Sequence, residues 1–90
     1  MRDSGTMPPL DTVNGFPIIA MWATPARVDE PPGRIFVADR GPEHAERYVV
    51  AWQGYSAKKQ RWQEWWVQGH YCVTLAEAAR AFTKRIEREV

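Results

Sequence analysis

The strand-forming segments of this 90-residue chain carry large apolar side chains at both alternating positions, and this feature constrains the fold most. In a strand expected at residues 47–53, Tyr48 and Trp52 point to one face, whereas Val49 points to the other. A strand with one solvated face alternates apolar and polar residues instead. Both faces of the sheet therefore need a cover.

One helix is predicted to cover the first face, at residues 75–89. Thr74 and Glu77 fit a capping box, in which each side chain bonds the backbone N–H of the other residue. Apolar residues then recur at helical spacing. We expect the helix to pack on the sheet through this stripe, which consists of Leu75, Ala78, Ala79, Phe82 and Ile86.

The second face of the sheet is left for another cover. A helix is about 10–12 Å wide and strands lie about 4.8 Å apart, so one helix screens about two strands on one face. One interpretation is that residues 16–22 and the proline-rich residues 24–33 fold over the second face. The other is an exposed aromatic surface that binds a partner or a second copy of the chain.

The order of predicted elements defines the fold class. Residues 1–15 read as a flexible N-terminal arm, and residues 16–90 as a single α+β domain. The domain is expected to be a small antiparallel β-sheet of three to four strands with one C-terminal amphipathic helix packed on one face. Pro17 places its strand at an edge, and Gly69 marks a bulge. The expected strands are residues 16–22, 34–40, 47–53, and 62–67 with 70–73.

Charge and cysteine content limit the cellular compartments and the classes of partner to be expected for this chain. The formal net charge is +1, which gives little attraction to phosphate or anionic lipid. Cys72 is the only cysteine, so no disulfide forms within the chain. No apolar run reaches the length of a membrane span or a signal segment. We expect a cytoplasmic protein, either a monomer or a homodimer.

Residues with catalytic or metal-binding chemistry are few. A zinc site would have to use His44, His70 and Cys72, one ligand short of a structural set. A nucleophile would have to be Ser56 or Cys72, and neither has a nucleophile-elbow sequence around it. We expect no enzyme activity, no metal and no cofactor, with Cys72 as a small buried apolar residue.

A basic hairpin loop is the strongest candidate binding segment. Lys58, Lys59 and Arg61 lie between Tyr55 and Trp62. Cations beside aromatic rings are typical of nucleic-acid surfaces, where charge meets phosphate and rings meet bases. The alternative is an ordinary solvated hairpin tip.

Residues 46–90 resemble the three-strands-then-helix layout of phage-integrase arm-binding domains and related AP2-like modules. The resemblance rests on an aromatic strand with Tyr48 and Trp52, the basic hairpin, and the helix start at residues 74–78. It implies DNA binding by the sheet. Glu64 and the near-neutral net charge depart from that pattern.

In length and architecture, the whole chain is also similar to small phage and mobile-element proteins, including anti-CRISPR proteins. That resemblance implies an inhibitor that docks on a host CRISPR effector complex and blocks its nucleic-acid or partner site. We prefer this hypothesis to a DNA-binding module, because the chain is rich in tryptophan but close to neutral. The predicted partner-binding residues are Trp52, Tyr55, Lys58, Lys59, Arg61, Trp62 and Trp65.

Overall fold

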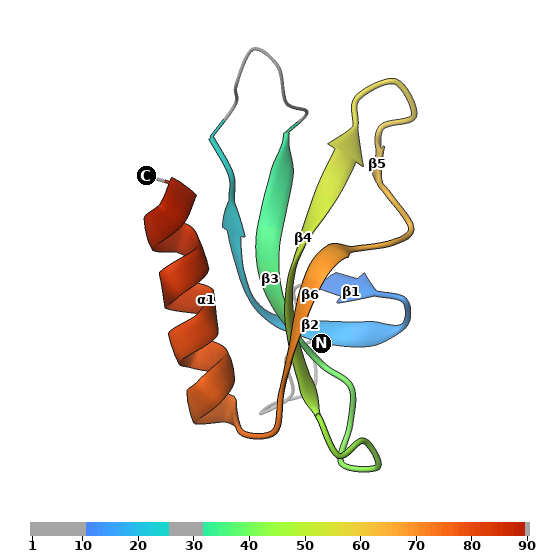
Figure 1. Cartoon of the computed structure of the whole chain (residues 1–90). Helices are drawn as coiled ribbons and strands as arrows, with labels where there is room; N and C mark the ends of the chain where they lie inside the picture. The colour runs from blue at the N-terminus through green and yellow to red at the C-terminus, as the bar shows by residue number, and fades with distance from the viewer. Residues whose placement is uncertain (1–10, 26–31, 90) are drawn as a thin grey trace, which may run out of the picture.

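The computed structural model describes residues 11–25 and 32–89, which form six strands and one helix (Figure 1). Most of the expected N-terminal arm, residues 1–10, lies outside the described residues. The elements are β1 (Asp11–Val13), β2 (Phe16–Ala23), β3 (Gly33–Asp39), β4 (Tyr48–Ser56), β5 (Arg61–Trp62), β6 (Val67–Cys72) and α1 (Leu75–Glu89).

The strands form one antiparallel sheet in the order β1-β2-β3-β4, and β5 and β6 both pair with the edge of β4 that faces away from β3. The first half of β4 pairs with β6 and its last two residues pair with β5. The α+β class and the C-terminal helix are confirmed, but the predicted count of three to four strands is too low. The expected strand at residues 62–67 breaks into β5 and a loop, because Trp66 leaves the sheet to pack against Phe36.

One strand that was not predicted, β1, lies in residues 1–15, the segment expected to be a flexible N-terminal arm. Asn14 and Gly15 both have positive φ, 50° and 81°, so they form a tight turn that folds β1 back onto β2. β2 then changes partner at a bulge at Ile19: residues 16–18 pair with β1, and residues 18–23 pair with β3. The predicted edge position of this strand is wrong, because β2 lies between β1 and β3. Pro17 pairs only with Thr12 of β1, so its missing N–H removes no bond to β3.

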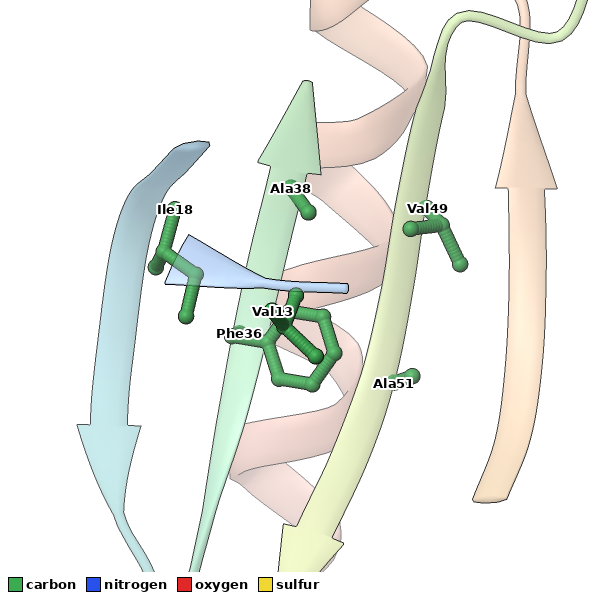
Figure 2. Packing of buried hydrophobic residues seen from close by; sticks show 6 residues of the cluster. All are labelled: Val13, Ile18, Phe36, Ala38, Val49 and Ala51. Carbon is green, nitrogen blue, oxygen red and sulfur yellow. The ribbon is translucent and has the colours of Figure 1, made fainter. Parts of the chain in front are cut away.

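The two faces of the sheet have separate cores. α1 covers Ile35, Val37 and Val50 on one face, with Cys72 and Ala78 also buried there. On the other face, β1 crosses in front of β3 and points toward β4, opposite the helix (Figure 2).

This second core is completely buried. Phe36, Ala38, Val49 and Ala51 are 0% exposed beneath Val13 and Ile18, and Phe16 and Trp66 pack around them. The N-terminal hairpin thus provides the second cover. Residues 26–31 of the proline-rich loop, which were expected to contribute, lie outside the described part of the chain.

The helix has the predicted bounds and the predicted cap. The backbone N–H of Glu77 donates to Thr74 Oγ1 at 3.1 Å, and the N–H of Thr74 donates to Glu77 Oε1 at 3.2 Å. The predicted packing stripe is wrong at two of its five residues, because Leu75 is 53% exposed and Ala79 is exposed. The helix packs against the helix-side core, the cluster around Ile35, Val37 and Val50, through Ala78, Ala81, Phe82 and Ile86.

The stripe is rotated because Arg85 faces β6. Its Nη1 donates to the Gln68 carbonyl at 2.6 Å. The predicted bulge is confirmed, since the β4–β6 register shifts opposite Gly69, where Gln68 has a positive φ of 55°.

Within residues 11–25 and 32–89, no helix is both long enough and apolar enough to cross a membrane.

Two truncations test this packing. Phe36→Ala should lower the free energy of unfolding by about 3–5 kcal/mol, because the ring is completely buried between the sheet and β1. Leu75→Ala should change it by less than about 0.5 kcal/mol, because this side chain is mostly solvated. Urea unfolding of both variants measures the difference, and equal losses would place Leu75 in the core after all.

Candidate functional site

Six of the seven predicted binding residues lie together on the β4–β5 hairpin and the loop after it. Tyr55 is the second-last residue of β4, Lys58 and Lys59 lie in the turn, and Arg61 and Trp62 form β5. Trp65 follows in the loop before β6. We call these six residues the hairpin surface; the hairpin projects beyond the rest of the sheet (Figure 1).

Trp52 is the predicted residue that lies elsewhere. Its side chain packs with the helix-side core, on the opposite face of β4 from Tyr55. A Cβ at Gly33 would lie 2.4 Å from the Trp52 ring, so the absence of a side chain at Gly33 makes room for the indole. The structure therefore does not bring Trp52 together with the hairpin surface.

A buried arginine supports the hairpin from below, and sequence reasoning missed it. Arg34 is 1% exposed, on the β3 face that also carries Phe36 and Ala38. Its Nε and Nη2 donate to Gln53 Oε1 at 3.0 and 2.7 Å, and its Nη1 donates to Asp11 Oδ2 at 2.7 Å. These charge-assisted bonds satisfy a guanidinium that would otherwise be very costly to bury.

The same network reaches the hairpin at two points. The Arg34 guanidinium lies 4.0 Å from the centroid of the Trp62 ring, a cation–π contact. Gln53 Nε2 donates to the Gln63 carbonyl at 2.6 Å. The sequence gives only a partial signal for this pair: Arg34 and Gln53 each continue the apolar parity of their strands, but the register that places them opposite each other is seen only in the structure.

The aromatic side chains of the hairpin surface differ in exposure. Tyr55 and Trp62 are half-buried and meet edge to face, with ring centroids 5.1 Å apart. Trp65 is 70% exposed, the largest value among the exposed large apolar residues. Lys59, Arg61, Trp62, Glu64 and Trp65 surround a hollow of about 380 Å³. An anchored aromatic pair thus lies beside a solvated indole.

The charges of the hairpin surface are exposed and mostly of one sign. Lys58, Lys59 and Arg61 are all solvated, and Glu64 is the acidic residue lining the hollow. This arrangement can bind by aromatic contact and by charge, without a group that reacts.

Cys72 and the two histidines are the residues that the sequence offers for metal binding or nucleophilic chemistry. No group of three metal-binding side chains gathers within residues 11–25 and 32–89. Burial raises the pKa of the Cys72 thiol, and the charges of Glu77 and Glu46 raise it further. A raised pKa disfavours the thiolate, the form in which a cysteine acts as a nucleophile.

Comparison with protein families, with characterised proteins and with solved structures gives no match.

The ion pair beneath the hairpin predicts an acid-sensitive stability. Burial raises the pKa of the Asp11 carboxyl, but the hydrogen bonds from Arg34 and from the Thr12 N–H, with the Arg34 charge, bring it below the usual 3.8. A carboxyl with a lowered pKa in the folded state stabilises the fold above its unfolded pKa. That stabilisation is lost as the pH falls through the folded value.

Asp11→Asn should therefore flatten the fall in the free energy of unfolding between about pH 6 and pH 2, measured by urea denaturation. Asp11→Glu is the matched control, because it keeps a carboxylate and thus an acid-dependent stability. An Asp11→Asn protein that loses stability as steeply as the wild type would show that the ion pair does not couple to folding.

Proposed function

We propose that this chain is a non-enzymatic binding protein of the anti-CRISPR type, which docks through the hairpin surface on a host CRISPR effector complex in the cytoplasm. Docking would block the nucleic-acid or partner site of that complex. The observation that carries the proposal is Trp65, 70% exposed beside an aromatic pair that is fixed from below by Arg34.

The composition of the hairpin surface supports a protein partner. Tryptophan, tyrosine and arginine are the residue types most enriched among binding hot spots, and they act best when their neighbours are already rigid. Arg34 and Gln53 supply that rigidity, since they hold Trp62 and the Gln63 carbonyl in place. A partner that covers Trp65 gains apolar area without having to order the hairpin first.

The alternative is a DNA-binding module of the integrase arm type, which the three exposed cations of the hairpin favour. The resembling domains bind DNA with a sheet face. In this chain the face opposite the helix is occupied by β1 and Trp66, and Phe36 beneath them is 0% exposed. DNA contact would thus depend on Lys58, Lys59 and Arg61, and three phosphates give a salt slope of only about 2.7.

The inhibitor hypothesis is tested by phage plating on a panel of bacterial hosts, each with one active CRISPR effector. The wild-type chain should restore plating in at least one host, and Trp65→Ala should lose most of that effect, because a central aromatic anchor is often worth more than about 2 kcal/mol. Val73→Ala is the matched control, since Val73 is an exposed apolar residue outside the hairpin surface, 59% exposed.

Failure across the panel, or equal activity of Trp65→Ala and Val73→Ala, would contradict the proposal. Changing Lys58, Lys59 and Arg61 together to Glu distinguishes the inhibitor from the DNA-binding module. In a protein interface, charges at the rim change the association rate more than the affinity. Tight duplex-DNA binding by the purified wild-type chain, abolished by this triple change, would favour the DNA-binding module instead. Each variant is first checked for a folded circular-dichroism spectrum.

A further inference from the structure

The second edge of β6 is unpaired within the described part of the chain. β6 hydrogen-bonds to β4 on one side, and no other described strand pairs with it. Residues 67–71 are all exposed, and only Cys72 at the end of the strand is buried. Each unpaired residue of an edge strand offers backbone N–H and C=O groups that can pair with another extended chain.

A groove lies between β6 and α1, the helix that follows β6 in the chain (Figure 1). Its main hollow, of about 840 Å³, lies between Gly69, His70 and Tyr71 on β6 and Ala81 and Lys84 on α1. A second hollow of about 590 Å³, which shares His70, continues along the helix past Ala79 and Arg80. The small side chains of Ala79 and Ala81 keep the helix wall of the groove low.

The groove is already formed in the free chain, because Arg85 ties its two walls together. Arg85 Nη1 donates to the Gln68 carbonyl at 2.6 Å and its Nη2 to Gln68 Oε1 at 3.2 Å. Nη1 also lies 3.4 Å from the Val50 carbonyl. This closes one end of the groove and leaves the edge from Gly69 onward open.

The open part of the groove is positively charged. Arg80, Lys84 and Arg88 line it from the helix. Glu46 and Glu77 are the acidic residues that line the two hollows. An occupant with negative side chains complements this surface.

We propose that the β6 groove binds an extended acidic peptide segment of a protein partner, which adds to the sheet as a strand beside β6. The peptide backbone pairs with the free edge of β6, and its carboxylates contact Arg80, Lys84 and Arg88. Peptides bind sheet edges in this way, with backbone bonds for affinity and side chains for selectivity. A second copy of the chain fits poorly, because pairing two β6 edges would bring both sets of cations together.

The test uses a fluorescein-labelled octapeptide of alternating Glu and Thr residues, with binding followed by anisotropy and by amide chemical shifts. The wild-type chain should bind it, and the largest shifts should fall on Gly69–Tyr71 rather than on the hairpin surface. Lys84→Glu with Arg88→Glu should weaken binding by at least about tenfold, through like-charge repulsion. Lys58→Glu with Lys59→Glu, the same change in charge on the hairpin, should have little effect.

Strand addition is separated from simple charge attraction by the same peptide with alternate backbone amides N-methylated. This analogue keeps every carboxylate but loses the backbone donors, so its binding should fall to the level of the Lys84→Glu/Arg88→Glu variant. The proposal would be overturned if the parent peptide did not bind, or if both peptides bound equally. It would also be overturned if a short DNA duplex displaced the peptide and bound the chain more tightly than the peptide does. Trp65→Ala should bind the peptide normally, so this result and that of the phage test are independent.

Discussion

The fold of this chain depends on how one buried guanidinium is satisfied. Arg34 extends from the central strand β3 and bonds Asp11 of β1 and Gln53 of β4, beneath the Trp62 ring of β5. A buried charge without partners would cost the folded state several kcal/mol, so β1, β3 and β4 have to be in place together. β1 cannot leave without exposing Arg34, and the hairpin cannot tilt without breaking the contact between Gln53 and Gln63.

This constraint also decides which surfaces remain for binding. The N-terminal hairpin that supplies Asp11 also supplies Val13 and Ile18, which bury the sheet face opposite the helix. A binding mode that needs that face is closed to the chain as it is folded here. What remains is peripheral: the hairpin surface at one end of the sheet, and the groove between β6 and α1 at its edge.

Local sequence signals predicted the parts of the fold that form from neighbours in the chain. The capping box placed the helix correctly, and alternation along residues 47–53 assigned both faces of β4. The basic hairpin was also predictable, since its residues are consecutive. The Asn14-Gly15 turn carried a usable hairpin signal, but the polar residues before it favoured a loose arm.

Features that join distant residues could not be predicted in this way. The pairing of Arg34 with Gln53 depends on the register of β3 and β4, which alternation alone leaves undetermined. The rotation of the helix stripe follows from Arg85 reaching Gln68, 17 residues away. The break between β5 and β6 follows from Trp66 packing on Phe36 across the sheet.

Gln53 couples the buried Arg34 to the hairpin, and native-state hydrogen exchange of the Gln53→Glu variant measures this coupling. This change keeps an acceptor for Arg34 but removes the donor to the Gln63 carbonyl. The Gln63 amide, which donates to Gly54, should exchange about tenfold faster, the effect of losing roughly 1.4 kcal/mol of local stability. The Arg40 amide, which donates to Arg47 at the other end of β3, should keep its rate. Unchanged exchange at Gln63, or an equal increase at both amides, would show that Gln53 does not couple Arg34 to the hairpin.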